Sequence, residues 1–347
     1  MRRQAAVVGF VLGSVVLLAC EEARAEGEAA LKLPLGLQEE ALYIPSDNPL
    51  TAEKIDLGRL LYFDKRLSTD STVSCASCHH PRFGFGDGQP VSTGVKKQKG
   101  ARSAPTTINR AFSKEQFWDG RAADLEEQAK GPIANPIEMG FTHDGVVARL
   151  KGIRGYREQF EKVFGTENLT IDRVAQAIAA YERTILSGNS PYDRFQAGDK
   201  SALSAAAQRG FALFEGKASC VRCHTGFNFA DEGFHNLGVG WDAKKKELRD
   251  TGRFQVTQKD QDKGAFKTPT LRDSAETAPY MHDGSQKTLE EVVEFYNKGG
   301  ESNPFLDPQV KPLSLTAAEK KDLVEFLRAL TGEIAADATT EPKAFPE

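Results

Sequence analysis

Cysteine, methionine and tryptophan are scarce in this chain, which has five, three and two of them among 347 residues. So few cysteines exclude a small fold that depends on a disulfide framework. The formal net charge of −4 argues against nucleic acid as a partner. The long apolar run at residues 5–19 is shorter than the roughly 20 residues of a membrane-spanning helix. Because strand-like alternation is also rare, we expect a mainly α-helical fold with long loops.

The cysteines that are present form a repeated Cys-x-x-Cys-His motif. Its two copies consist of Cys75, Cys78 and His79 and of Cys220, Cys223 and His224. This pattern is the attachment signature of c-type haem, in which two thiols add across the vinyl groups and the histidine binds the iron. A zinc site is a weaker interpretation because each copy offers only three ligands. We therefore predict two covalently attached haem c groups.

The first 20 residues have the features of an export signal. Two arginines precede the apolar run, and the run ends in Leu-Leu-Ala-Cys at residues 17–20. A charged start, a short apolar stretch and a small residue before the break are typical of a secretory signal. Because the last four residues resemble a bacterial lipobox, we predict a lipid anchor on Cys20 and a periplasmic location at the outer membrane. Cleavage near Ala23 or Ala25 without lipidation is the alternative.

Similar segments, 58–63 and 210–214, precede the two haem motifs and indicate that a haem-bearing unit was duplicated. Apolar residues recur at helical spacing over 171–185, and capping boxes at Thr288 and Thr316 begin two later helices. The predicted divisions begin with a signal peptide with lipobox at 1–20 and a tether at 21–40. A first haem domain follows at 41–188 and a second at 189–333, and the C-terminal part of the second is expected to pack back on the first. Residues 334–347 are predicted to form a loose tail.

Longer strings resemble the bacterial dihaem cytochrome c peroxidases and their MauG-type relatives. They include Phe-Trp-Asp-Gly-Arg-Ala at 117–122, Lys-Thr-Pro-Thr-Leu-Arg at 267–272 and Ala-Pro-Tyr-Met-His-Asp-Gly at 278–284, with shorter matches at 127–132, 138–139 and 252–254. The likeness runs in the same order from about residue 41 to residue 331. It implies two cytochrome c-like domains, each carrying one covalently bound haem, and an oxidoreductase that acts on hydrogen peroxide.

The same resemblance assigns catalytic roles near the first haem. Glu138 is the expected acid–base catalyst, since breaking the O–O bond needs a group that moves a proton from one peroxide oxygen to the other. Gln128 is expected to orient the peroxide, and Pro132 is expected to shape the pocket. Trp118 is expected to lie between the haems and to relay electrons.

The axial ligands implied by the resemblance differ from those of the ordinary peroxidases in the family. Those enzymes cap the first haem with a second histidine until the other haem is reduced, but the matching residue here is Val95, which cannot bind iron. His80 and His143 are the alternative ligands, the first adjacent to the proximal histidine and the second remote. At the second haem the usual methionine is replaced by Tyr296, as in MauG-type enzymes, with Met281 as the alternative. A phenolate favours high-valent iron, so this haem should store an oxidising equivalent.

Other residues have expected roles that are less specific. The family usually binds calcium between its domains, and the matching positions are Ser103, Thr277 and Pro279, with Ser103 in place of the usual asparagine. His282 is expected to be a hydrogen-bonding partner near a haem. Trp241 is expected to be structural, and His235 has no assigned role.

Three functions are compatible with these residues. The first is a MauG-type enzyme, in which peroxide reacts at a five-coordinate haem, both haems store oxidising equivalents, and a Trp or Tyr of an exported partner protein is oxidised by long-range electron transfer. The second is a peroxidase that reduces peroxide to water with electrons from a small cytochrome or cupredoxin. The third is an electron-carrying dihaem cytochrome, which Glu138 and Gln128 argue against. Val95 and Tyr296 together favour the first.

Overall fold

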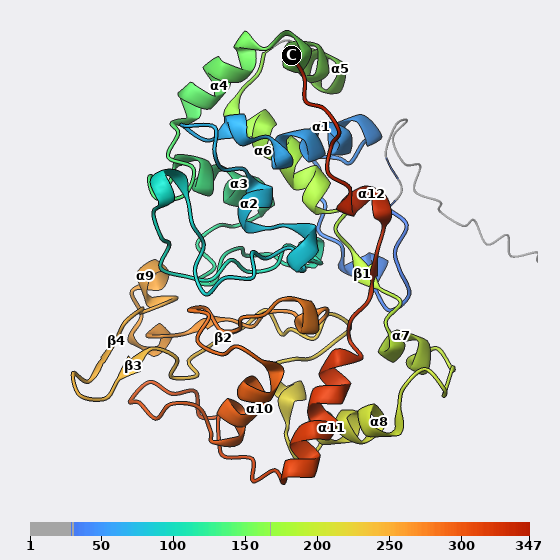
Figure 1. Ribbon diagram of the computed structural model, residues 1–347, viewed down its shortest axis with the longest axis vertical. Helices are drawn as coiled ribbons and strands as arrows, with labels where there is room; N and C mark the ends of the chain where they lie inside the picture. Colours follow the sequence, from blue (N-terminus) through green and yellow to red (C-terminus); the bar gives the residue numbers. More distant parts are fainter. Residues whose placement is uncertain (1–28, 30, 167) are drawn as a thin grey trace, which may run out of the picture.

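The computed structural model describes residues 29, 31–166 and 168–347 and is mainly helical. Its helices form two groups, one above the other in Figure 1. The upper group, the first lobe, contains α1 (Ala52–Phe63), α2 (Cys75–Cys78), α3 (Leu125–Ala134), α4 (His143–Gly152), α5 (Arg154–Phe164) and α6 (Ile171–Glu182). The lower group, the second lobe, contains α7 (Pro191–Gln196), α8 (Ala205–Glu215), α9 (Phe254–Thr257), α10 (Leu289–Asn297) and α11 (Ala317–Arg328). Within the described ranges, no helix is long and apolar enough to cross a membrane. The predicted signal and lipobox lie outside the described residues.

The strands are short and pair in antiparallel twos. The pairs are β1 (Ser187–Gly188) with β6 (Glu333–Ile334), β2 (Phe234–His235) with β5 (Phe266–Lys267), and β3 (Trp241–Asp242) with β4 (Glu247–Leu248). In the first pair Ser187 lies opposite Ile334, so the segment that leaves the first lobe runs beside the segment that returns to it. The two lobes are thus joined by two adjacent strands.

Buried apolar side chains form one cluster in each lobe. The first cluster lies around α1 and α6 and includes Leu57, Tyr62 and Val174. The second lies around α8 and α11 and includes Phe214 and Phe326. The predicted boundary at 188–191 falls between the residues of the two clusters, although β6 and the end of the chain belong to the first lobe.

The same helix crossing occurs in both lobes. Helix α1 packs on α6 and precedes the first haem motif, and α8 packs on α11 and precedes the second. A glycine lies at each crossing: a Cβ at Gly58 would overlap the backbone oxygen of Ala177, and one at Gly210 would overlap that of Asp322. These glycines belong to the two segments whose similarity suggested a duplication.

Two helix starts were predicted correctly, and one helix end was not. Thr288 and Thr316 accept hydrogen bonds from the backbone N–H groups of Glu291 and Glu319, at 3.2 and 3.3 Å. The helix predicted over 171–185 ends at Glu182. The hydroxyl of Thr184 donates to the carbonyl of Tyr181 at 2.7 Å, a local bond that competes with continued helix.

The C-terminal segment that was predicted to be loose is packed on the first lobe. Helix α12 (Ala336–Thr339) buries Ala338, whose carbonyl accepts a hydrogen bond of 2.7 Å from the hydroxyl of Tyr181. Phe345 packs against the first cluster. Part of the predicted tether is packed as well, because the carbonyl of Leu35 accepts from the N–H of Asn189 at 2.7 Å.

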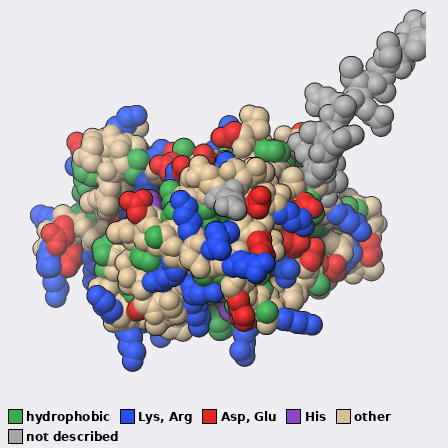
Figure 2. Space-filling view, turned by 90° about the horizontal axis from the view of Figure 1, so that it is seen from above, with side chains coloured by type: hydrophobic (Ala, Val, Ile, Leu, Met, Phe, Trp, Pro, Cys, Tyr) green, Lys and Arg blue, Asp and Glu red, His purple; other side chains and the backbone are tan. Residues whose placement is uncertain are grey.

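The surface of the first lobe carries mixed charge. Figure 2, seen from above relative to Figure 1, shows Lys and Arg side chains interspersed with Asp and Glu side chains over this face. The charge on this face is therefore mixed and not of a single sign.

Replacing either crossing glycine by alanine should destabilise the protein. Because the added methyl group would overlap backbone atoms of the facing helix, we expect Gly58→Ala and Gly210→Ala each to lower the free energy of unfolding by about 1–3 kcal/mol. Gly152→Ala is the matched control, since Gly152 is helical and its Cβ would meet nothing within 4 Å. Denaturant unfolding followed by circular dichroism would measure this, and equal stability of all three variants would contradict the crossing geometry.

Candidate functional site

The first Cys-x-x-Cys-His motif forms the short helix α2, which Ser74 caps. His79 ends this helix, and its Nδ1 lies 3.2 Å from the carbonyl oxygen of Phe85. Since a carbonyl only accepts, Nδ1 carries the proton and Nε2 remains for a metal. Burial lowers the pKa of His79 and so favours the neutral imidazole that binds iron. The hydroxyl of Tyr62 donates to the carbonyl of His79 at 2.8 Å and fixes the backbone at this point.

The second motif repeats this arrangement. Its first three residues form the 3₁₀ turn Cys220–Arg222, and the Nδ1 of His224 lies 3.0 Å from the carbonyl oxygen of Phe229. Burial lowers the pKa of His224 as it does that of His79. Phe85 and Phe229 are both buried and both have positive φ, at 58° and 51°. The two histidines are therefore oriented in the same way by equivalent backbone carbonyls.

The four motif cysteines fit thioether attachment of haem. All four are free thiols, and burial raises the pKa of Cys78 to about 11 and that of Cys220 to about 12. Each pair therefore presents two free thiols beside a histidine whose Nδ1 is already bonded to a carbonyl, which is the donor set that a c-type haem requires.

Cys223 also lies near Asp231 and His235, in a group whose ligand atoms are within 4.8 Å of one another. His235 bridges two carboxylates, with Nε2 2.9 Å from Asp231 and Nδ1 2.6 Å from Asp307. A thioether at Cys223 would remove the thiolate that a separate metal ion would need, so we assign this cysteine to haem.

Glu138 lies in the turn that follows α3, on the side of the first haem motif. The amide of Asn135 donates to its carboxylate at 2.6 Å, and the N–H of Val95 donates to its backbone carbonyl at 2.8 Å. Burial raises the pKa of Glu138, and the nearby charge of Arg121 opposes this increase. The charge of Glu138 also contributes to the raised pKa of Cys78, so the carboxyl lies close to that thiol. A carboxyl with a raised pKa beside a haem site can both accept and donate a proton.

Gln128 and Pro132 lie one turn apart on α3, and both are half-buried beside the buried residues Leu125, Ala129 and Ile133. Pro132 has no N–H, so the carbonyl of Gln128 lacks its ordinary helical partner at this point. The carbonyl of Pro132 accepts from the N–H of Met139 at 3.2 Å, which ties the helix to the residue after Glu138. The structure thus brings the three residues predicted for peroxide chemistry onto α3 and the turn that follows it.

Val95 is 1% exposed and belongs to the first hydrophobic cluster. The two alternative histidines are occupied elsewhere. His80 accepts from the N–H of Arg82 through Nδ1 at 3.1 Å, and His143 lies 2.9 Å from the carbonyl of Lys130 through Nε2.

Tyr296 lies on α10 near the second motif. Leu289 and Val293, which lie on the same side of α10 as Tyr296, are buried. The hydroxyl of Tyr296 has no hydrogen bond to any described residue. Burial raises the pKa of Tyr296, and the charges of Cys220 and Cys223 add to the increase. The phenol is therefore partly buried and has no hydrogen-bond partner among the described residues, on a helix whose Leu289 and Val293 belong to the cluster against which Cys220 packs; this is compatible with metal binding.

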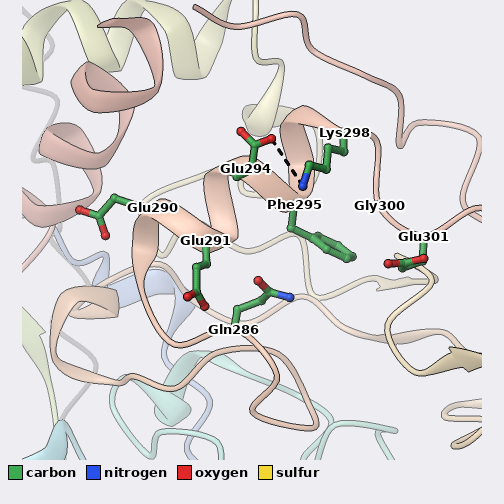
Figure 3. A pocket seen from close by; sticks show the side chains of 8 residues that line it. All are labelled: Gln286, Glu290, Glu291, Glu294, Phe295, Lys298, Gly300 and Glu301. Atoms are coloured by element: carbon green, nitrogen blue, oxygen red, sulfur yellow. Dashed lines mark ion pairs between the residues drawn. The ribbon is translucent and has the colours of Figure 1, made fainter. Parts of the chain in front are cut away.

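The opposite face of α10 borders a pocket of about 410 Å³ (Figure 3). Its lining is rich in carboxylates, including Glu290, Glu294 and Glu301. Glu294 pairs with Lys298 at 3.6 Å, drawn as a dashed line, and also with Lys320 at 2.6 Å. This hollow lies apart from both haem motifs, so we do not take it as the catalytic site.

Trp118 lies where the two lobes meet. Its indole N–H donates to the carbonyl of Ser103 at 2.9 Å, and its own carbonyl accepts from the N–H of Lys267 in the second lobe at 2.8 Å. The N–H of Ser103 donates to the carbonyl of His282 at 2.7 Å. The imidazole of His282 stacks on Phe266, with ring centroids 3.6 Å apart. Trp118 is therefore anchored by both lobes.

The remaining predicted residues lie in the same region or stay without a role. Thr277 packs against Gly84, and a cis peptide joins Ala278 to Pro279. The calcium predicted at Ser103, Thr277 and Pro279 stays a prediction. Met281 has a positive φ of 71°, and no interaction recorded for it suggests iron binding.

Sequence reasoning missed Arg121 and the buried pair of Glu126 and Arg183. Arg121 belongs to the quoted motif at 117–122, but only the fold places its charge near Glu138. Arg183 is 0% exposed and donates two hydrogen bonds to Glu126, at 2.6 and 2.9 Å, which fixes α3 against α6.

Several known proteins are similar to this chain in sequence and in fold. Residues 52–201 match the family described as di-haem cytochrome c peroxidase. The methylamine utilization protein MauG of Methylorubrum extorquens is 42% identical over 319 residues, which cover 92% of this chain and 89% of that protein. The chain belongs to the dihaem cytochrome c peroxidase and MauG family.

Two further relatives agree with this membership. The cytochrome c551 peroxidase of Nitrosomonas europaea is 40% identical over 290 residues, covering 84% of this chain and 83% of that protein. A solved MauG-like protein associated with microbial copper homeostasis has a TM-score of 0.84 and 34% identity, covering 90% of this chain and 99% of that one. As a member of this family, the protein is an oxidoreductase that acts on peroxide, and the family implies two haem cofactors.

Removing the Glu138 carboxyl should slow the reaction with peroxide. We expect Glu138→Gln to reduce the second-order rate by about 10²- to 10⁴-fold, the range typical of a general acid–base catalyst. Arg121→Gln should move the acid limb of the pH–rate profile to higher pH, because the positive charge of Arg121 lowers the pKa of Glu138 and its loss raises that pKa further. Stopped-flow mixing across pH would measure both effects. An unchanged rate in Glu138→Gln would exclude the assignment.

Proposed function

We propose that this protein is a MauG-type enzyme, which reacts with peroxide in its fully ferric state and oxidises a residue of a partner protein. The observation that carries the proposal is Tyr296, a partly buried phenol without a hydrogen-bond partner beside the second haem motif. Val95 supports it, because a buried aliphatic side chain stands where the family's ordinary peroxidases carry a capping histidine. The first haem would then be open to peroxide without prior reduction.

In this proposal the bound haem iron supplies the site where peroxide binds and the O–O bond breaks. The carboxylate of Glu138 would take a proton from one peroxide oxygen and deliver it to the other, the proton movement that release of water from the O–O bond requires. The amide of Gln128 orients the peroxide by hydrogen bonding. Neither the aliphatic side chain of Val95 nor the ring of Pro132 offers an atom that could bind iron in place of the peroxide.

Tyr296 has a distinct task at the second motif. Its pKa is raised by burial, so without a cation the phenol stays protonated at neutral pH. A metal ion inverts this preference because its charge stabilises the phenolate, as it does for coordinated thiols. An anionic oxygen ligand lowers the reduction potential relative to a thioether, and Trp118, fixed between the lobes, is placed to relay electrons from one site to the other.

The remaining features of the proposal concern location and partners. We place the protein in the periplasm, tethered by lipid on Cys20 of the predicted lipobox, with an exported Trp- or Tyr-bearing protein as its substrate. Calcium at Ser103, Thr277 and Pro279 is part of the same proposal.

A second candidate function is peroxide removal with electrons from a small cytochrome or cupredoxin. The relatives named cytochrome c peroxidase favour it. It requires a second haem that accepts electrons readily, which a tyrosinate ligand opposes.

Stoichiometric peroxide added to the fully ferric protein tests the proposal. We expect loss of the ferric signals and a new near-infrared band within seconds, without reductant. Val95→His should abolish this reaction until the protein is reduced, because the imidazole can occupy the open face, whereas the matched variant Val95→Ile should react like the wild type. A wild-type protein that is inert until reduced, and that then turns over with a reduced cytochrome, would favour the second function.

A further inference from the structure

Glu182 is a buried acid that the proposed chemistry does not use. It is the last residue of α6, it is 4% exposed, and its Oε2 has no hydrogen-bond partner among the described residues. Burial raises the pKa of Glu182 to about 8. Since an unpaired charged carboxylate in an apolar interior is costly, its protonation should respond to any charge placed nearby.

The cations closest to Glu182 are already bonded to other groups. Arg183 donates to both carboxylate oxygens of Glu126, at 2.6 and 2.9 Å. Arg110 donates to the side-chain oxygen of Gln116 at 2.8 Å and to the carbonyl of Glu115 at 3.1 Å. Neither guanidinium is recorded in a hydrogen bond or an ion pair with Glu182, although their charges favour its ionised form.

The hydroxyl groups of the two tyrosines near Glu182 also form hydrogen bonds with other groups. The hydroxyl of Tyr62 donates to the carbonyl of His79 at 2.8 Å, and that of Tyr181 donates to the carbonyl of Ala338 at 2.7 Å. The titratable and charged groups that face Glu182 are therefore Tyr181 of α6, Arg183 at its C-cap, Glu126 of α3, Arg110 of the 3₁₀ turn Arg110–Phe112, Tyr62 of α1 and Cys75 of α2.

Glu182 is electrostatically coupled to the first haem motif. After burial, the charge of Glu182 is the largest cause of the raised pKa of the Cys75 thiol. It also contributes to the raised pKa of Tyr62, whose hydroxyl binds the backbone of the proximal histidine. Geometry agrees with this coupling: Tyr181, the residue before Glu182, packs on Tyr62 with ring centroids 5.0 Å apart, and the Tyr62 hydroxyl bonds to the carbonyl of His79. The end of α6 that carries Glu182 therefore packs beside the first haem motif, and charges interact strongly in a buried environment.

We propose that Glu182 is a proton-binding site that compensates the charge of the first haem. When one electron reaches this haem, the Glu182 carboxylate takes up one proton from solvent. When the electron leaves, the carboxyl releases that proton, so the net charge of the interior stays constant. The proposal needs a haem on the first motif but does not depend on whether the enzyme is of the MauG type.

Spectroelectrochemical titration of the holoprotein between pH 6 and pH 10 tests this site. We expect the midpoint potential of the first haem to fall as pH rises, because the reduced form holds the extra proton. The slope should approach 59 mV for each tenfold change in proton activity, the one-electron conversion. In Glu182→Gln the slope should be largely lost. Glu161→Gln is the matched control, because it makes the same substitution at an exposed residue of α5, and it should behave like the wild type.

Two results would overturn the proposal. The first is a pH-independent potential of the first haem in the wild type, which requires no variant. The second is an unchanged slope in Glu182→Gln. Proton uptake on reduction, followed with an indicator dye in weak buffer, gives a second readout that should fall in Glu182→Gln. A ferric protein that fails to react with peroxide would contradict the MauG-type function without affecting these potentials.

Discussion

The hydrogen bond from each proximal imidazole to a backbone carbonyl is the constraint on which both haem sites depend. His79 bonds to Phe85 and His224 bonds to Phe229, in each case through Nδ1. This bond fixes the tautomer, turns Nε2 toward the position of the metal and keeps the ring from rotating. The acceptor carbonyls belong to residues in the left-handed conformation, so the loop after each motif is shaped around the histidine. Helix pairs crossing at glycine support both loops, which gives the two lobes a common design.

The proposed function requires the two lobes to keep a fixed relation, because in that proposal electrons pass between a haem in each lobe. Two adjacent strands and a set of buried polar contacts provide it. Arg102 of the first lobe bonds to Asp119 in its own lobe and to Asp250 in the second, each at 2.6 Å. Lys267 pairs with Glu232, whose other oxygen accepts from the hydroxyl of Ser113 at 2.9 Å. Breaking such buried pairs is costly because an unpaired charge remains, so they favour one arrangement of the lobes and of Trp118 between them.

Local signals in the sequence were reliable, and signals that depend on tertiary contact were not. The caps at Thr288 and Thr316, which the structure confirms, are made by residues a few positions apart, whereas haem attachment at the two motifs stays a prediction. The end of α6 was placed too late because periodicity reports which side chains are buried, not where backbone bonding stops. The packing of Ala338 could not be predicted, since an alanine-rich segment shows nothing of the surface that receives it. Likewise Glu126 and Arg183 are far apart in sequence. The roles of Glu138, Gln128 and Tyr296 came from the family resemblance and stay predictions.

The central claim is that the first haem has an open face at Val95 while the second is closed by Tyr296. Electron paramagnetic resonance of the resting, fully ferric protein tests this claim most directly, because spin state reports the number of axial ligands. We expect one high-spin ferric signal from a five-coordinate haem and one low-spin signal from a haem with two axial ligands, with the low-spin signal changed in Tyr296→Met. Two low-spin signals in the wild type would contradict it, since a second ligand would then cover the first haem.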